Sequence, residues 1–368
     1  MSTVNLSSTL SSRVRRYAMC LLLGFGLAGC VFTRPFRDST GRIIAGSIAS
    51  METITIGGIP QRFWFRGVSV DNPVLILLHG GPGASESPLF RHYNSELEQH
   101  CVIVYWDQRA AGRSYSSKIP PGTMTIAQFV SDLGEVVEMT KRRFGKKKVV
   151  LLAHSWGTIL GTIYTYEHPE NVAAYAGTGQ IADVPLDEKI SYEFDLSIAR
   201  ARGNRCAIKQ LTAIGPPPHS ASQMLVSRKW CERFGGSFHS KLSTGWLIWE
   251  ALGTDEANLV DLVKFGQGNH FSLNYLWPEE SRLNLTQYRD FHVPIFFLLG
   301  RYDEQVPSVL AARYFATIRA PFKRLVWFEH SAHNPPFEEP EKFNRVVITE
   351  IIPIAKAQDG GRAPTARR

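Results

Sequence analysis

Leu151-Leu152-Ala153-His154-Ser155-Trp156-Gly157 is the stretch of sequence that decides the fold. Its apolar first half is typical of a buried strand, and a helix is expected directly after it, over Thr158–His168. Small residues two positions before and two after a serine allow the tight strand-to-helix turn that exposes a nucleophilic hydroxyl. Ala153 and Gly157 meet this requirement, although the first position is more often glycine. The stretch therefore predicts a nucleophile at Ser155 rather than an ordinary turn.

A nucleophilic serine needs a histidine base and an acid that orients the base, and in this architecture they follow in the order serine, acid, histidine. Asp303 comes just after the apolar run 295–299, and ligand sites in open α/β sheets lie at the carboxyl ends of strands. His333 follows the last predicted strand. The sequence thus favours Asp303 as the acid and His333 as the base, with Glu304 and His330 as the neighbouring alternatives.

The negative charge that develops on the substrate oxygen also needs donors. In this architecture they are the backbone N–H of the residue after the nucleophile and an N–H from the loop after the third strand. These positions are Trp156 and, in His79-Gly80-Gly81-Pro82-Gly83, Gly81. Glycine allows the backbone to approach a substrate closely.

Working outward, short apolar runs alternate with helical patterns, which predicts a mostly parallel sheet with helices on both faces. The clearest helix spans 125–145, with a capping box at Thr125 and Gln128. Residues 183–290 break the alternation and lack strand runs, so we expect an inserted helical cap there. The expected strands are 51–56, 62–70, 74–78, 101–106, 149–152, 173–179, 295–299 and 324–328.

The N-terminus has the form of an export signal. Residues 1–29 contain three arginines and no acid, and an apolar stretch from Tyr17 to Phe32 follows them. The segment ends in Leu27-Ala28-Gly29-Cys30, which resembles the lipobox of bacterial lipoproteins and implies an acylated Cys30. Val31 in place of aspartate favours the outer membrane if the cell has one. An uncleaved apolar anchor is the alternative, although the stretch is short for a full span.

The distribution of charge along the chain argues against a nucleic-acid-binding function. The net charge of +8 suggests a nucleic-acid partner, but residues 1–29 contribute +3 and residues 357–368 contribute +2, so only +3 remains for the rest. No basic stripe is visible in the core, and nucleic-acid binding is excluded. The chain is divided as signal peptide 1–29, linker 30–50, core 51–182, cap 183–290, core 291–356 and disordered tail 357–368.

The motif 79–83, the motif Asp107-Gln108-Arg109-Ala110-Ala111-Gly112-Arg113-Ser114 and the elbow resemble the proline iminopeptidase branch of the α/β-hydrolase superfamily. The similarity in order and spacing covers about residues 51–355. It implies an α/β-hydrolase fold with a helical cap, a Ser-Asp-His serine hydrolase without metal or cofactor, and release of N-terminal residues, often proline, from small peptides. The chain departs from the pattern at Ala110 and Ala153, where glycine is usual.

In such peptidases, acidic residues of the cap hold the free amine of the substrate. The matching positions cannot be aligned, and the candidates are Glu193, Asp195, Glu250 and Glu256. Aromatic side chains of the cap either line an apolar pocket or seal the cap to the sheet: Trp230, Phe234, Trp246, Trp249, Phe265, Phe271, Tyr275 and Trp277. Cys101 is expected to be a core thiol, and Cys206 and Cys231 either pair in an exported protein or stay free.

The residues predict a mechanism in which Ser155 attacks a carbonyl, His333 takes its proton, and an acyl-enzyme forms and is hydrolysed. An aminopeptidase is the first hypothesis, and an esterase, lactonase or amide hydrolase on the same scaffold is the second. A non-catalytic binding lipoprotein is the third, and the complete set of three residues argues against it. Epoxide hydrolysis would need aspartate at position 155. The sequence gives neither the physiological substrate nor the oligomeric state.

Overall fold

The computed structural model describes residues 32–358, and residues 1–31 and 359–368 lie outside this description. The predicted signal peptide, the predicted lipidation site Cys30 and most of the predicted tail therefore lie outside the described residues. The last described helix is α13 (Ile352–Gln358), so the first two residues assigned to the tail are helical. The Gln358 side chain donates a hydrogen bond to the carbonyl of Ala173, which holds this end against the sheet.

The described residues form an eight-stranded sheet in the order β1-β2-β4-β3-β5-β6-β7-β8. Its first two pairings are antiparallel and the remaining five are parallel, so the predicted mostly parallel sheet is confirmed. The strands are β1 (Ile48–Ile56), β2 (Ile59–Gly67), β3 (Val74–Leu78), β4 (Val102–Asp107), β5 (Val149–His154), β6 (Val172–Thr178), β7 (Ile295–Gly300) and β8 (Lys323–Phe328).

The central strands are apolar throughout because both faces of the sheet are covered. Every residue of β3 and β5 is buried, and the two strands pair in parallel with Leu78 opposite Ala153. The chain moves outward from β3 to β4 and then returns to β5, so the strand order reverses between β3 and β5. Ligand sites in open α/β sheets lie at the carboxyl ends of strands at such a reversal.

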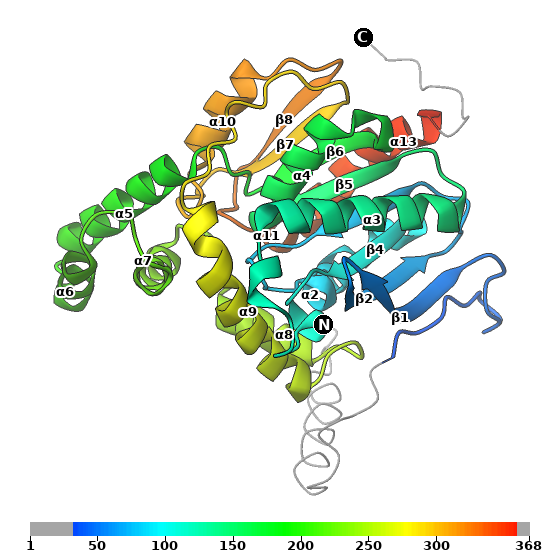
Figure 1. The fold of residues 1–368 in the computed structure, drawn as a ribbon, viewed down its shortest axis with the longest axis horizontal. Coiled ribbons are helices and arrows are strands. Elements are labelled where there is room, and N and C mark those ends of the chain that lie inside the picture. The colour runs from blue at the N-terminus through cyan, green and yellow to red at the C-terminus, as the bar shows by residue number, and fades with distance from the viewer. Residues whose placement is uncertain (1–31, 359–368) are drawn as a thin grey trace, which may run out of the picture.

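Two hydrophobic clusters separate the faces of the sheet. On one face the strands pack against α3 (Ile126–Phe144), α4 (Trp156–Glu167) and α10 (Ser308–Thr317). On the other face they pack against α2 (Ser87–Asn94), α11 (Pro335–Glu338), α12 (Pro340–Val346) and α13. Figure 1 shows α3 and α4 in front of the strands and α13 behind them.

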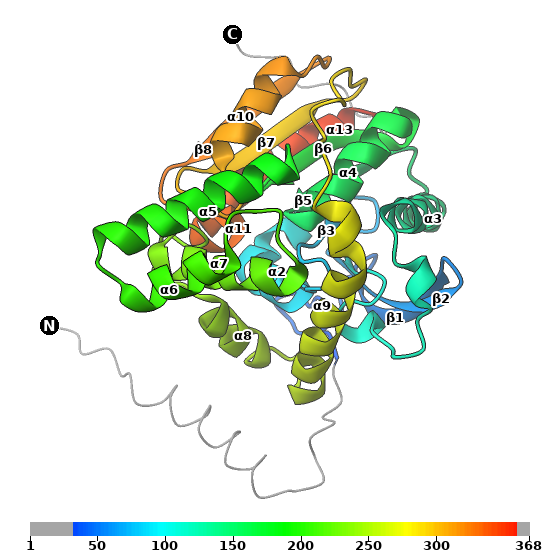
Figure 2. The same cartoon turned by 60° about the vertical axis from the view of Figure 1, so that its left-hand side comes forward.

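The predicted helical insertion lies between β6 and β7. It consists of α5 (Val184–Ala201), α6 (Arg205–Ile214), α7 (Ala221–Phe234), α8 (Thr244–Leu252) and α9 (Leu259–Glu280). Each of these helices begins after an Asp, Asn or Ser whose side chain caps the first turn. Figures 1 and 2 show the five helices gathered on one side of the molecule. Within residues 32–358, no helix combines the length and the apolar character that crossing a membrane requires.

Candidate active site

Ser155 occupies the sharp turn between β5 and α4. Its backbone has φ +52° and ψ −121°, a conformation that non-glycine residues rarely adopt. The backbone N–H of Ser155 donates a hydrogen bond to the Thr178 carbonyl, and its own carbonyl accepts from the Thr158 N–H and hydroxyl. Strain held in place by such bonds is common at functional sites. The serine side chain stands at the N-terminus of α4, where the helix dipole favours negative charge.

The small residues around the elbow are a consequence of close packing. A Cβ atom at position 157 would lie 2.1 Å from the Leu78 carbonyl oxygen, so only glycine fits there. Ala153 is fully buried, and its methyl group lies beside Gly161, where an added Cβ would come within 3.3 Å of it. Ala110, the second departure from the family pattern, has φ +61°, which explains why glycine is usual at this position.

Asp303 and His333 are directly hydrogen bonded. The distance from Asp303 Oδ2 to His333 Nδ1 is 2.9 Å, and both side chains are buried. The other carboxylate oxygen, Oδ1, accepts the backbone N–H groups of Gln305 and Val306. The imidazole ring lies against Gly179, where a Cβ atom would come within 2.6 Å of His333 Cε1. Aspartate and histidine are thus fixed in orientation by the loops after β7 and β8.

The neighbouring alternatives are separated from this pair. The Glu304 backbone N–H donates to the Gly236 carbonyl, and burial together with the neighbouring Asp303 charge raises the pKa of its carboxyl to about 7. His330 is exposed, and its backbone N–H donates to Glu339. Of the two histidines, the one that the Asp303 carboxylate contacts is His333.

Ser155 and His333 line one cavity of about 470 Å³ between the sheet and the cap. The Nε2 atom of His333 is buried and has no hydrogen-bond partner among the described residues. Because Asp303 occupies Nδ1, this second ring nitrogen is the one available for proton exchange with a group in the cavity. The structure thus brings the three predicted residues to one place.

The loop after β3 is anchored through a motif that follows β4. His79 Nδ1 lies 2.8 Å from the Gly80 carbonyl oxygen, and His79 Nε2 accepts the Gln108 backbone N–H, so the ring carries its proton on Nδ1. The Gln108 side-chain oxygen accepts the Trp156 indole N–H. Gly81 has φ +129°, and a Cβ atom there would lie 2.5 Å from the Gly83 nitrogen. Among the hydrogen bonds of the described residues, none uses the backbone N–H of Gly81 or Trp156.

A buried ion pair beside the elbow was not anticipated from the sequence. Glu86 Oε1 lies 2.8 Å from His154 Nδ1, and His154 Nε2 lies 3.1 Å from the backbone oxygen of His333. Burial opposes the charge of both groups, yet their mutual attraction outweighs it, so the pKa of His154 is raised and that of Glu86 is lowered. Glu86 and His154 are 68 positions apart, so no sequence motif predicts that they meet. The His154 ring lies alongside the ring of His333, with 5.0 Å between the ring centroids.

The large cavity has an apolar wall contributed by the cap. This wall consists of one exposed residue of α7 and residues from the inward faces of α8 and α9: Leu225, Leu247, Ile248, Leu252, Leu262 and Phe265. On the side of the core, Trp64 and Phe337 complete the wall. Such a surface favours apolar parts of a ligand, and polar groups at Ser155 and His333 would fix its orientation.

A second, smaller cavity of about 50 Å³ lies on another side of Ser155 and is acidic. Gly81 and Ser155 line it together with Asp187, Glu188 and Glu280 of the cap. Glu188 forms an ion pair with Arg228, whereas both carboxylate oxygens of Asp187 and Oε2 of Glu280 have no hydrogen-bond partner among the described residues. Burial raises the pKa of Glu280 to about 8 and holds that of Asp187 well above its usual value. Three carboxyl groups thus face one arginine.

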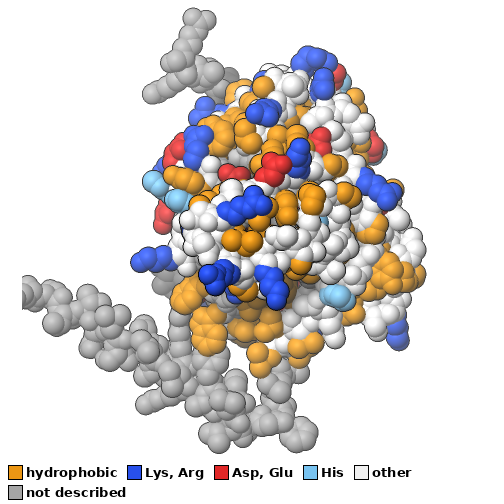
Figure 3. Space-filling model, turned by 90° about the vertical axis from the view of Figure 1, so that its left-hand side faces the viewer, with side chains coloured by type: hydrophobic (Ala, Val, Ile, Leu, Met, Phe, Trp, Pro, Cys, Tyr) orange, Lys and Arg blue, Asp and Glu red, His pale blue; other side chains and the backbone are white. Residues whose placement is uncertain are grey.

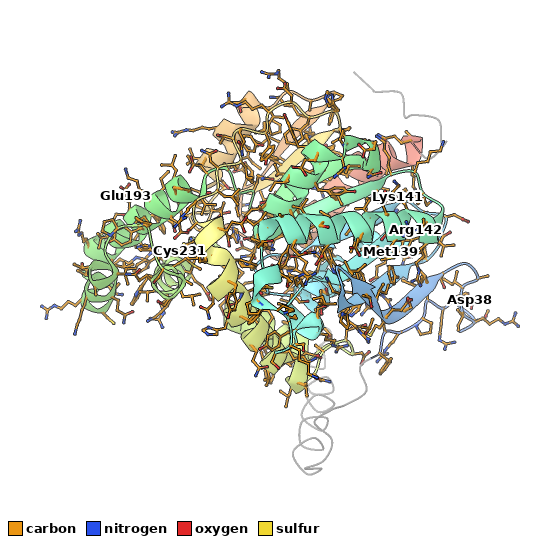
Figure 4. All side chains as sticks on the ribbon, in the orientation of Figure 1. Asp38, Met139, Lys141, Arg142, Glu193 and Cys231 are labelled. Carbon is orange, nitrogen blue, oxygen red and sulfur yellow. The ribbon has the colours of Figure 1, made fainter. Side chains whose placement is uncertain are left out.

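The four cap acids considered from the sequence lie elsewhere. Glu193 is exposed on α5, as Figure 4 shows, and Asp195 accepts a hydrogen bond from Ser227 within the cap. Glu250 lies 3.3 Å from His92, and Glu256 forms a 2.6 Å ion pair with Arg91. Glu256 contributes to the wall of the large cavity but is already neutralised. Sequence reasoning missed Asp187, Glu188 and Glu280 because no motif marks them.

The cap aromatics divide into lining and packing residues. Phe265 lines the large cavity and Trp277 the acidic one. Trp230 and Phe234 stack in a separate core of the cap, and Phe271 packs against Tyr115. The remaining three are exposed, and they are Trp246, Trp249 and Tyr275.

The three cysteines of the described residues, Cys101, Cys206 and Cys231, are free thiols. Cys206 is exposed at the start of α6, whereas Cys231 is buried on α7, where Figure 4 labels it. The pairing considered from the sequence is therefore not present. No group of three or more metal-ligating side chains occurs within the described part of the chain.

Taken together, the fold and the geometry at Ser155 define a protein of the α/β-hydrolase class. Residues 73–202 match the family described as alpha/beta hydrolase fold. The chain is 33% identical over 300 residues to the probable aminopeptidase YbaC of Bacillus subtilis, covering 81% of this chain and 94% of that protein. The chain therefore belongs to the α/β-hydrolase family, in its proline iminopeptidase-like branch.

More distant relatives agree with this placement. The proline iminopeptidase of Neisseria gonorrhoeae is 25% identical over 305 residues, which cover 78% of this chain and 92% of that protein. The crystal structure of proline iminopeptidase from Mycobacterium smegmatis superimposes with a TM-score of 0.60 at 17% identity, covering 84% of this chain and all of that one. The structural likeness at this identity supports the shared fold.

Proposed function

We propose that the protein is a serine hydrolase that releases N-terminal residues from small peptides, an aminopeptidase of the proline iminopeptidase type. The observation that carries this proposal is the acidic cavity beside Ser155. Arg228 pairs with Glu188, which leaves Asp187 and Glu280 without an ion-pair partner among the described residues; the ammonium group of a ligand would favour their ionised forms and donate to their unpartnered oxygen atoms. A volume of about 50 Å³ limits that ligand to a small group close to the nucleophile.

In this proposal Ser155 Oγ attacks the carbonyl of the first peptide bond while His333 Nε2 takes the hydroxyl proton. Asp303 stabilises the imidazolium that forms. The backbone N–H groups of Gly81 and Trp156 stabilise the oxyanion, and each such donor contributes about 3 kcal/mol to transition-state stabilisation. His333 returns the proton to the leaving amine, and water then hydrolyses the acyl-enzyme.

A fluorophosphonate probe tests the nucleophile, because it modifies activated serines covalently. We expect labelling of the purified protein and none of Ser155→Ala. Equal labelling of both proteins, or none of either, contradicts a serine hydrolase and favours a binding protein.

Aminoacyl arylamides with a free amine and their N-acetylated counterparts test the peptidase assignment. We expect turnover of prolyl or alanyl arylamides and at least a hundredfold lower kcat/KM after acetylation, since acetylation removes the ammonium charge. Asp187→Asn and Glu280→Gln should raise KM more than they lower kcat.

The second candidate is an esterase, lactonase or amide hydrolase without a requirement for an amine. The apolar wall of the large cavity favours it. Turnover of short acyl esters with no turnover of free-amine arylamides would establish this activity in place of the peptidase.

We also propose that Cys30 is acylated and holds the protein to the bacterial cell envelope. The basic segment, the apolar stretch and the lipobox-like residues before Cys30 support this proposal. Metabolic labelling with palmitate should mark the wild type and not Cys30→Ser, and equal labelling would exclude acylation at this residue.

A further inference from the structure

Helix α8 is apolar on both of its faces although it lies at the surface. Of its nine residues, Glu250 is the only charged one and Leu247 the only buried one. Leu247 and Ile248 face the large cavity, whereas Trp246 and Trp249 are exposed by 50% and 51%. A helix that is hydrophobic all round is normally buried in a core or in lipid. The apolar outward side of α8 is therefore typical of an interaction site.

The first two turns of the neighbouring helix α9 also expose apolar side chains. Leu259, Val260 and Val263 are exposed by 49%, 42% and 58%, and the loop 253–258 joins them to α8. We call Trp246, Trp249, Leu259, Val260 and Val263 the α8–α9 apolar surface. In Figure 3 hydrophobic side chains gather along the lower edge of the face shown, with lysine and arginine side chains above them. A gathering of exposed apolar side chains of this kind is typical of an interaction site.

The first described residues of the chain lie at this surface. Arg34 forms an ion pair with Asp255, and the Thr33 hydroxyl lies 3.3 Å from Glu256, both in the loop between α8 and α9. The chain therefore enters the folded part beside the α8–α9 apolar surface. The residues just before this point include the apolar stretch Tyr17–Phe32 of the sequence.

The neighbouring cap helix is positively charged. Glu232 of α7 accepts hydrogen bonds from Thr244 at the start of α8, so the two helices adjoin. Lys229 and Arg233 of α7 are exposed. Tryptophan and aliphatic side chains beside lysine and arginine are the composition of proteins that rest on anionic lipid.

We propose that the α8–α9 apolar surface docks onto an anionic lipid bilayer. Trp246 and Trp249 enter the headgroup region, and Lys229 and Arg233 lie near the lipid phosphates. The described part of the chain begins at the same edge, where Arg34 pairs with Asp255. This contact is independent of the hydrolytic activity and of acylation at Cys30, which would only tether the chain.

Intrinsic fluorescence tests this docking directly. All eight tryptophans lie in the described part of the chain, and only Trp246 and Trp249 among them are exposed. Purified full chain is mixed with vesicles of phosphatidylglycerol and dibrominated phosphatidylcholine, whose bromines quench tryptophan at short range. We expect the loss of up to about a quarter of the emission, because two of the eight tryptophans would enter the bilayer. Non-brominated vesicles of the same charge should cause no loss.

Matched variants separate docking from tethering. Trp246→Phe with Trp249→Phe should remove the quenching and keep flotation with vesicles, since phenylalanine preserves the apolar surface. Val260→Asp with Val263→Asp should reduce quenching at least tenfold. Val309→Asp, at a position exposed by 47% on α10 at the opposite end of the molecule, should leave it unchanged (Figure 1).

Two results would overturn the proposal. One is vesicle-bound wild type with unquenched tryptophans, which would mean that an N-terminal anchor alone holds the protein or that a second copy covers the surface. The other is equal quenching of the wild type and the Val260→Asp, Val263→Asp variant. The comparison of brominated with non-brominated vesicles uses the wild type alone, so it decides the matter even if that variant does not fold.

Discussion

Both carboxylate oxygen atoms of Asp303 accept hydrogen bonds within the protein. One oxygen accepts two backbone N–H groups and the other contacts His333, so neither can exchange partners with solvent. Glu304 is one position away on the same turn and is half-buried, and its backbone N–H donates to the Gly236 carbonyl. Two adjacent carboxylates therefore provide a matched comparison.

Asp303→Asn should lower kcat by about 10⁴-fold, because the amide cannot favour the tautomer that leaves Nε2 free to accept a proton. Glu304→Gln should change kcat by no more than a few-fold. Steady-state hydrolysis of a prolyl arylamide by the two purified variants measures both effects. Equal losses in the two variants would argue against Asp303 as the orienting acid.

The Glu280 carboxyl, with a pKa of about 8, makes substrate affinity dependent on pH. It is mostly protonated at pH 6, and a substrate ammonium ion favours the carboxylate, so binding releases a proton. KM should therefore fall as pH rises from 6 to 7.5, before the peptide amine itself loses its proton near pH 8. In Glu280→Gln this decrease should disappear, which a pH series of KM values checks.

The same shift affects stability with a defined sign. The folded pKa of Glu280 lies above the unfolded value of about 4.3, so its contribution is complete below pH 4 and is lost as pH rises through 8. Urea unfolding at pH 6 and pH 9 should show a smaller decline for Glu280→Gln than for the wild type. An identical decline in both proteins would mean that the carboxyl is not protonated in the fold.

At the scale of elements, helix α4 and the elbow before it can pack closely against β3 because residue 157 is a glycine, which has no Cβ atom. Gly157 lies in the first turn of α4 directly against the Leu78 and His79 carbonyl groups. Gly134 also lies within a helix, α3, but a Cβ there would meet only Tyr164 at 3.5 Å. Both glycines have helical backbone conformation, but an added Cβ would collide with backbone at Gly157 and would fit at Gly134.

Gly157→Ala should destabilise the protein by roughly 2–4 kcal/mol and abolish activity, since a clash with backbone must displace the elbow. Gly134→Ala should raise the free energy of unfolding by about 0.5–1 kcal/mol, because alanine favours the helix. Denaturant titration of both variants tests the contrast. If Gly157→Ala left the free energy of unfolding and the activity unchanged, β3 would have to move aside at little cost.

The sequence predicted the elements because each carries a local signal. For the same reason it singled out Ser155, Asp303 and His333, which the structure brings to one place. The apolar runs became β3, β4, β5, β6 and β7 with both faces covered, and His333 could be separated from His330 by its context. The pair Glu86–His154 could not be predicted, because it forms only when the segment before α2 packs against the end of β5. The acids Asp187, Glu188 and Glu280 could not be predicted either, because α5 and α9 of the cap bring them together only in the folded chain. Cap acids chosen by position alone, such as Glu193 and Glu256, prove to be exposed or already paired.

At the scale of the whole molecule, the motif after β4 connects the sheet to α3 through a fully buried ion pair. Arg109 contacts Asp132 at 2.9 Å, and both side chains have no exposed surface. Gln61 and Gln128 donate to the same carboxylate, and Arg109 also donates to the Gly57 carbonyl. The hairpin of β1 and β2 is thus held to the core by charge and hydrogen bonds as well as by packing.

Arg109→Met should lower the free energy of unfolding by about 3–5 kcal/mol, because it leaves the Asp132 charge buried without its partner. Arg319→Met removes the exposed pair with Asp290, and it should leave the free energy of unfolding nearly unchanged, because solvent screens an exposed pair. Thermal and urea unfolding of both variants provide the measurement. A small effect at Arg109 would imply that water reaches Asp132 in the variant.

Thr33 and Arg34 contact both the core sheet and the cap. Arg66 of β2 donates to the Thr33 hydroxyl and the Arg34 carbonyl, while Asp255 and Glu256 of the cap hold the same two residues from the other side. A pulling force applied to the N-terminal end would therefore reach the sheet and the α8–α9 loop at once. The contacts of Thr33 and Arg34 divide that force between the core and the cap. We therefore expect that tension on the N-terminal end does not separate the cap from the sheet and open the large cavity.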